Sequence, residues 1–205
     1  MVDELAQQQA ERGSFVSPQA SAMLQRHAER LQGLASLRVA DAEGRVVMGA
    51  GVVPGLNVSW ADRPFFPLLR DNPAAGLSIS PPVLGRVSGV WLVSFARRID
   101  RPDGGFAGLL SASVTLDTFN KLVALPDLGP NGVVALRSSD FTLVARHPPL
   151  TTTPRGQVGN QTPPPELAAL VAAGRRVGND RSVRNADGHV RLVGFRQLPG
   201  RQQRL

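Results

Sequence analysis

Residues 90–114 have the pattern of two β-strands joined by a turn, and this pair constrains the fold more than any other stretch. The two runs are VWLVSFARRI and FAGLLSASV, and the polar turn DRPDGG separates them. Side chains alternate between the faces of a strand, so Trp91, Phe95 and Arg97 share one face and Arg98 lies on the other. We expect Trp91 and Phe95 to belong to the core and to line part of a pocket, and Arg98 to be solvated.

Helix signals and hairpins follow one another in an order that repeats along the chain. Ser17 can cap a helix whose first residue is Pro18. Alternation and turn residues then predict a hairpin over 34–50, a short helix over 62–70, the strand pair described above, a helix over 115–129, a hairpin over 131–148, a helix over 165–174 and a last hairpin over 181–198. The order of helix and hairpin thus occurs once in full and once in part.

This partial repeat predicts an α+β fold, with an N-terminal helix followed by two modules that are antiparallel sheets flanked by helices. We expect the N-terminal helix within residues 1–34, the first module in 35–128 and the second module in 129–205. The second module is smaller and lacks a closing strand, which would leave an exposed sheet edge.

Charge and composition argue against a nucleic-acid-binding role. The net charge of the 205 residues is +7, and eight arginines after position 170, against only Asp180 and Asp187, carry most of it. That basic stretch holds a single aromatic residue, Phe195, whereas a nucleic-acid reader combines basic residues with stacking aromatics. We therefore expect no nucleic-acid partner, although a basic nucleic-acid-associated protein stays an alternative.

The chain offers few groups for catalysis or metal binding. There is no cysteine, and the three histidines (His27, His147 and His189) lack the spacing of zinc ligands. Neither a Ser-His-Asp set, nor paired carboxylates, nor a phosphate loop can be assembled, so we expect no enzyme activity, no catalytic residue, no cofactor and no metal. An unidentified hydrolase remains the alternative from the enzyme class. No apolar run reaches the roughly 18 residues of a membrane span, and the first residues, MVDELAQQQAERG, lack the apolar segment of a signal peptide, so we expect neither in these residues.

Several motifs in this order resemble the double Cache (PAS-like) sensor region of bacterial membrane signalling proteins. They are LRVADAEGRVV, DRPFF, GLSISPPVLGRVSGVWLVSFARRI, DGGFAGLLSASV, LPDLGPNGVVALRSSDFTLVARHP and ADGHVRLVGFRQL. The resemblance as a whole covers roughly residues 17–198. The likeness is greatest to regions placed ahead of diguanylate cyclase domains, and histidine kinases and chemoreceptors carry similar regions.

The resemblance implies a periplasmic ectodomain of an inner-membrane protein, excised from two flanking membrane helices and from a cytoplasmic output domain. That output would be a diguanylate cyclase acting in cyclic di-GMP signalling, with a histidine kinase or chemoreceptor as the alternative. The first module would be membrane-distal and would hold a small ligand, and the second would be membrane-proximal. A homodimer through the N-terminal helix is also implied.

The segment DRPFF resembles the Arg-x-Trp-Tyr element with which many Cache domains grip a ligand carboxylate. Arg63 would take the arginine role, because a guanidinium can bind a carboxylate with two parallel hydrogen bonds. We expect a small anionic or carboxylate ligand bound by Arg63, Phe65, Phe66, Trp91, Phe95 and Arg97. An amino acid fits less well, since the chain has no tyrosine and no acidic residue could be placed for the ammonium group. The alternative is that Arg63 pairs with Asp62 or with another nearby carboxylate and caps the short helix.

Overall fold

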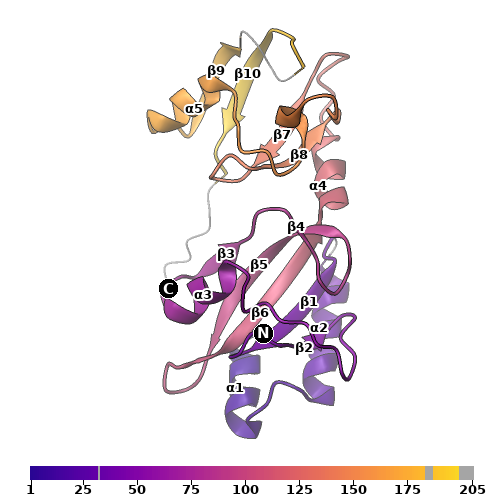
Figure 1. Cartoon of the computed structure of the whole chain (residues 1–205), viewed down its shortest axis with the longest axis vertical. Coiled ribbons are helices and arrows are strands. Elements are labelled where there is room, and N and C mark those ends of the chain that lie inside the picture. Colours follow the sequence, from indigo (N-terminus) through magenta and orange to yellow (C-terminus); the bar gives the residue numbers. More distant parts are fainter. Residues whose placement is uncertain (32, 183–186, 199–205) are drawn as a thin grey trace. The chain divides into compact units, whose positions relative to one another are not determined.

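The computed structural model describes residues 1–31, 33–182 and 187–198 and divides the chain into two compact units. Unit 1 is Met1–Thr118 and unit 2 is Phe119–Arg201. The division falls within helix α4 (Leu116–Val123), earlier than the predicted boundary near Leu128 (Figure 1).

Unit 1 begins with two helices where the sequence predicted one. Helix α1 (Val2–Arg12) ends at Gly13, whose φ of 65° places it in the left-handed region that glycine adopts without strain. Helix α2 (Pro18–Arg30) begins as predicted, because the Ser17 side chain accepts a hydrogen bond from the backbone N–H of Ala20 at 3.0 Å. The connection keeps Phe15 buried, so both helices can pack on the same sheet.

The sheet of unit 1 is antiparallel and has the strand order β2-β1-β6-β5-β3, with β4 also paired to β5. Its strands are β1 (Ser36–Asp41), β2 (Val46–Gly49), β3 (Leu77–Ile79), β4 (Val83–Leu84), β5 (Trp91–Asp100) and β6 (Phe106–Thr115). The predicted hairpin over 34–50 and the predicted strand pair over 90–114 are therefore confirmed. Helix α3 (Phe65–Asp71) is the short helix expected near 62–70.

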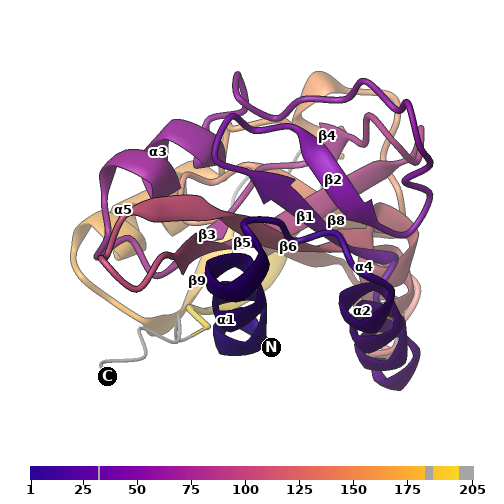
Figure 2. The ribbon, with the colours of Figure 1, turned by 90° about the horizontal axis from the view of Figure 1, so that it is seen from below.

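The two faces of this sheet carry separate cores. On one face, which we call the α1–α2 face, the buried residues are Leu5, Phe15, Ala20, Leu24, Leu37, Val39, Met48, Ile99, Ala107 and Leu110. On the other, the α3 face, they are Ala40, Val46, Trp60, Phe65, Phe66, Leu69, Ala96 and Leu109. Figure 2 shows α1 and α2 on one side of the sheet and α3 on the opposite side.

Unit 2 contains two separate two-stranded antiparallel sheets in its described residues. The first pairs β7 (Val134–Arg137) with β8 (Leu143–His147), as predicted for 131–148. A 3₁₀ turn, η1 (Pro154–Gly156), and helix α5 (Pro165–Ala172) follow, and α5 is preceded by Pro164 and has no side-chain cap. The second sheet pairs β9 (Val177–Ser182) with β10 (Arg191–Arg196), so its hairpin begins before the predicted start at 181. Part of its turn, 183–186, lies outside the described residues.

Candidate ligand-binding site

The six predicted ligand-binding residues do not lie on one face of the sheet. Phe65 and Phe66 belong to α3 and pack on the α3 face against Ala96 and Leu109. Trp91, Phe95 and Arg97 alternate with Ala96 along β5, so they project from the α1–α2 face. The expectation that the Trp91, Phe95 and Arg97 face backs a pocket under Phe65 and Phe66 is therefore corrected, because the sheet itself separates the two groups.

The exposure of the β5 residues also differs from the expectation. Trp91 is 55% exposed, Arg97 is exposed and Phe95 is half-buried, so Trp91 is no core residue. Val93, which lies between Trp91 and Phe95 on the same face, is buried, so the exposure along this face of β5 is uneven. In contrast, the face of β5 that faces α3 is buried along Leu92, Ser94 and Ala96.

The two phenylalanines of α3 are core residues. The Trp60 and Phe65 rings meet edge to face with centroids 6.0 Å apart, and the Phe66 and Phe106 rings do so at 5.6 Å. Such T-shaped pairs are favourable because the positive edge of one ring meets the negative face of the other. This cluster fixes α3 on the sheet at the end where Ala40 lies.

Arg63 lies at the start of α3 and is partly exposed. Its Nη2 donates a hydrogen bond to the carbonyl oxygen of Leu84 at 2.9 Å, which ties α3 to β4. Asp62 pairs with Arg86 instead of Arg63, through two hydrogen bonds of 2.6 and 2.7 Å. The alternative in which Arg63 pairs with Asp62 is therefore not what the structure shows.

Arg98 is 8% exposed, so the expectation that it is solvated was wrong. Its Nη1 donates to the carbonyl oxygens of Leu69 and Arg70 at 2.9 and 2.6 Å, and its Nε pairs with the carboxylate of Asp100. The guanidinium also stacks on the Phe106 ring at 5.1 Å. The last carbonyls of a helix have no partner within the helix, so Arg98 satisfies them and holds the end of α3 on the sheet.

Five polar residues that the sequence reasoning missed form a buried row on the α3 face. Arg38 on β1 lies opposite Ser111 on β6, and Ser36 lies opposite Ser113, which in turn lies opposite Ser94 on β5. Directly opposed residues of antiparallel strands point to the same face, and all five side chains are buried. We call them the Arg38 row. The signal was present in the sequence as polar residues two apart, in SLR and in LSASV.

Arg38 is an unusual member of a sheet interior because no carboxylate accompanies it. It is 6% exposed, and its Nε donates to the carbonyl oxygen of Ala50 at 2.7 Å. Within the described residues, no carboxylate lies within ion-pair distance of its guanidinium, and burial alone lowers the pKa of Arg38. A buried charge is costly unless an opposite charge and hydrogen bonds compensate it.

Two serine hydroxyls of the row are also without a partner. The Oγ atoms of Ser36 and Ser111 are buried, and neither makes a hydrogen bond to any described residue. An unsatisfied buried hydroxyl costs about 1–3 kcal/mol, so native proteins normally fill such a place with a water molecule or a ligand. The Arg38 row therefore combines an uncompensated cation with free hydroxyl groups in one small area.

Two chain segments lie over Arg38. They follow β2, whose last residue, Gly49, pairs with Arg38 within the sheet and has a φ of 123°. A Cβ on Gly51 would lie 3.3 Å from the Val87 side chain and 3.8 Å from Nη2 of Arg38. The segments around Gly51 and Val87 thus meet above the guanidinium, and the ion pair of Asp62 with Arg86 fixes the second segment beside α3.

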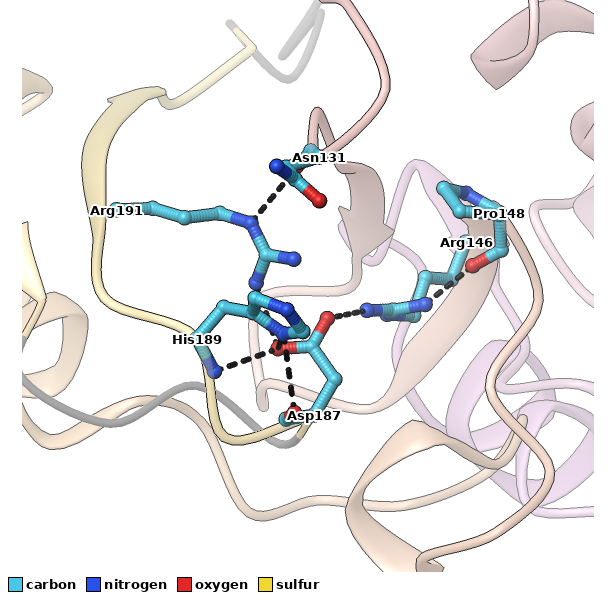
Figure 3. Close-up of polar contacts among 6 residues, drawn as sticks. All are labelled: Asn131, Arg146, Pro148, Asp187, His189 and Arg191. Atoms are coloured by element: carbon cyan, nitrogen blue, oxygen red, sulfur yellow. Dashed lines mark hydrogen bonds and ion pairs between the residues drawn. The ribbon is translucent and has the colours of Figure 1, made fainter.

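A second polar cluster lies in unit 2 and is centred on Asp187 (Figure 3). Its Oδ2 accepts from Nη2 of Arg146 at 2.9 Å, and its Oδ1 accepts from Nη1 of Arg191 at 2.6 Å. Arg191 also donates from Nε to the carbonyl oxygen of Asn131 at 2.6 Å, and the His189 N–H donates to Asp187 Oδ1 at 3.3 Å. The hydrogen bond from Arg191 holds the pKa of the Asp187 carboxyl well below its usual range. Through Arg146, Asp187 joins the turn before β10 to β8.

Metal and membrane sites are not evident in the parts that the structure describes. Among the described residues, no group of three or more His, Cys, Asp or Glu side chains is placed to hold a metal ion. No described helix has both the length and the apolar character needed to cross a membrane.

The comparisons with known proteins give likenesses to solved structures only. No protein-family model and no curated protein matches the chain. The extracellular domain of rpHK1S-Z16, classed by its name as a histidine kinase, superposes with a TM-score of 0.79 at 27% identity, over 95% of this chain and 78% of that one. The ligand-binding domain of the Pseudomonas fluorescens chemoreceptor CtaA, in complex with L-serine, superposes with a TM-score of 0.58 at 15% identity, over 93% of this chain and 76% of that one. The ligand-binding domain of the Pseudomonas aeruginosa chemoreceptor PctC, in complex with GABA, superposes with a TM-score of 0.52 at 17% identity, over 87% of this chain and 76% of that one.

These likenesses confirm the predicted fold class. The chain has the fold of extracellular sensor domains of histidine kinases and chemoreceptors. The likeness to the extracellular domain at 27% identity agrees with the predicted sensory role and periplasmic location. The two chemoreceptor likenesses lie below 25% identity and bear on the fold alone. A diguanylate cyclase does not occur among these structures, so the predicted cyclase output has no support from them.

Proposed function

We propose that the chain is the ligand-binding part of a transmembrane sensor and that unit 1 binds a small anionic ligand at the Arg38 row. The observation that carries this proposal is the buried guanidinium of Arg38, which lacks a carboxylate and stands beside the unsatisfied hydroxyl of Ser111. A small anion at this place would supply the missing charge and accept hydrogen bonds from both groups. A charge-assisted hydrogen bond of this kind contributes about 1.5–3 kcal/mol.

The position of the row suits a ligand-controlled switch. The row lies on the same face as α3, and α3 is held there by Arg63 at its start and by Arg98 at its end. Ligand contact with the row and with the overlying Gly51 and Val87 segments would change how tightly these segments close. A ligand shifts such an equilibrium only through its differential affinity for the two arrangements.

The output of the parent protein is proposed from the comparisons. The likeness to the extracellular domain of a histidine kinase, at 27% identity, favours a histidine kinase or a chemoreceptor over the predicted diguanylate cyclase. Attachment to the membrane through segments on either side of this chain, and a periplasmic location, follow from the same proposal. A homodimer through the N-terminal helices also stays a proposal. Because Ala20 and Leu24 already pack on the sheet of unit 1, such a dimer would use other residues of these helices.

A thermal-shift screen of small acids, amino acids and sugars can test the site. We expect some of the compounds to stabilise the wild type, and we expect Arg38→Gln to remove this effect. Arg63→Gln is the matched control, because Arg63 was the anion-binding residue expected from the sequence and lies outside the Arg38 row. If the stabilisation is lost in Arg63→Gln and kept in Arg38→Gln, the ligand binds at Arg63, as expected from the sequence, and not at the Arg38 row. Equal stabilisation of all three proteins would refute binding at either arginine.

A further inference from the structure

The charged groups of the unit 1 sheet and of its connecting segments narrow the class of ligand. Between β1 and the end of β6 the chain contains six acidic residues: Asp41, Glu43, Asp62, Asp71, Asp100 and Asp103. Five of them are paired with arginines, namely Asp41 and Glu43 with Arg45, Asp62 with Arg86, Asp71 with Arg70, and Asp100 with Arg98. The sixth, Asp103, accepts from the N–H of Gly105 within the exposed turn between β5 and β6.

The α3 face itself carries no carboxylate at the Arg38 row. The row consists of one arginine and four serines, and the next residues on the same face are Ala40, Ala96 and Leu109. A primary ammonium group is a compact, strongly hydrated cation and needs an anion when it is desolvated. Beside the buried guanidinium of Arg38 it would meet a like charge and no carboxylate, which disfavours a ligand that carries an amino group.

Oxygen atoms, in contrast, find complementary partners at the row. Arg38 can bind a carboxylate, while the free hydroxyls of Ser36 and Ser111 can each donate to one more acceptor and can accept from a ligand hydroxyl. From this charge balance we infer that the Arg38 row selects a small carboxylic acid with further oxygen atoms and no amino group, such as a hydroxy acid or a dicarboxylate. This inference rests on the proposed function.

The experiment compares acids that differ only in the amino group, by calorimetric titration of the whole chain. L-lactate is compared with L-alanine, and succinate with L-aspartate. We expect the two acids to bind, and we expect each amino acid to bind at least about tenfold more weakly, because no carboxylate receives its ammonium group. Arg38→Gln should weaken binding of the acids about 10- to 100-fold. Arg97→Gln, an exposed arginine on the opposite face, should leave it unchanged.

A second variant keeps the test valid if Arg38→Gln does not fold. Ser111→Ala removes a hydroxyl without a partner and should leave the free protein folded while weakening the acids about 3- to 10-fold. If an amino acid binds as tightly as its matched acid, and Ser111→Ala weakens both, the inferred ligand class is wrong and the proposed site stands. If neither acids nor amino acids bind at millimolar concentration, both the inferred ligand class and the proposed site are wrong. The same conclusion follows if Arg38→Gln and Ser111→Ala leave binding unchanged.

Discussion

The Asp187 cluster of unit 2 permits a prediction whose size follows from the geometry. Asp187→Asn keeps the shape of the side chain and removes its charge, so the guanidinium groups of Arg146 and Arg191 lose their shared anion. All three side chains are largely buried, with exposed fractions of 15%, 9% and 16%. Removing one partner of a buried ion pair costs about 3–5 kcal/mol. The Asn oxygen still accepts one hydrogen bond, so we expect a loss of about 2–3 kcal/mol in the stability of unit 2.

Hydrogen exchange is the suitable assay, because both tryptophans of the chain, Trp60 and Trp91, belong to unit 1 and fluorescence would not report on unit 2. The slowest amides of β8 should exchange about 30- to 150-fold faster in Asp187→Asn, while those of unit 1 serve as the internal reference. Asp127→Asn is the matched control, since Asp127 is exposed and accepts one turn hydrogen bond from the N–H of Gly129.

The pH dependence of the Asp187 cluster gives a second measure of the same interaction. Because the folded pKa of Asp187 is lowered, the carboxylate stabilises unit 2 above its unfolded pKa of about 3.9, and this contribution is lost as pH falls further. Asp187→Asn should therefore differ from the wild type at neutral pH and approach it in acid. If Asp187→Asn accelerates exchange no more than Asp127→Asn does, the cluster contributes nothing to stability and the reasoning is refuted.

Three further predictions concern unit 1. Ser111→Ala should leave the free energy of unfolding unchanged or raise it by about 1 kcal/mol, because it removes an unsatisfied hydroxyl. Its control, Ser17→Ala, should lower the free energy of unfolding by about 1 kcal/mol through loss of the helix cap. Urea unfolding measures both, and a clear loss of stability in Ser111→Ala would show that the Ser111 hydroxyl has a hydrogen-bond partner. Arg98→Met should lower the free energy of unfolding by about 3 kcal/mol, because the last carbonyls of α3 lose their hydrogen-bond donor. A loss below about 1 kcal/mol would contradict the role of Arg98 in holding the end of α3. The hydrogen bond from Arg86 lowers the pKa of Asp62 to about 2, so this ion pair should hold as pH falls to about 4 and be lost as pH falls through about 2. In a carboxyl NMR titration, Arg86→Gln should raise the pKa of Asp62, and an unchanged pKa would exclude the ion pair in solution.

Local patterns in the sequence were sufficient for most of the strands and for one helix start, but not for β3, β4 or the beginning of β9. The alternation over 90–114 predicted β5 and β6, and Ser17 with Pro18 predicted the start of α2, because these signals depend only on neighbouring residues. The prediction of a single N-terminal helix failed because Gly13 ends α1 and the chain turns back before Ser17. A glycine in a helical pattern permits such an end without requiring it.

Only the tertiary structure decided which side of each strand was buried and which groups met there. Alternation along β5 defines two faces but does not say which one α3 covers, so Arg97 was assigned to a ligand pocket and Arg98 to solvent, whereas Arg97 is exposed and Arg98 is buried. Two of the groups that Arg98 binds are carbonyls of α3, and β6, which places Ser111 opposite Arg38, lies far along the chain. Burial of these groups depends on which helix packs on which face, and this is set by the sum of many non-local contacts that no short stretch of sequence contains.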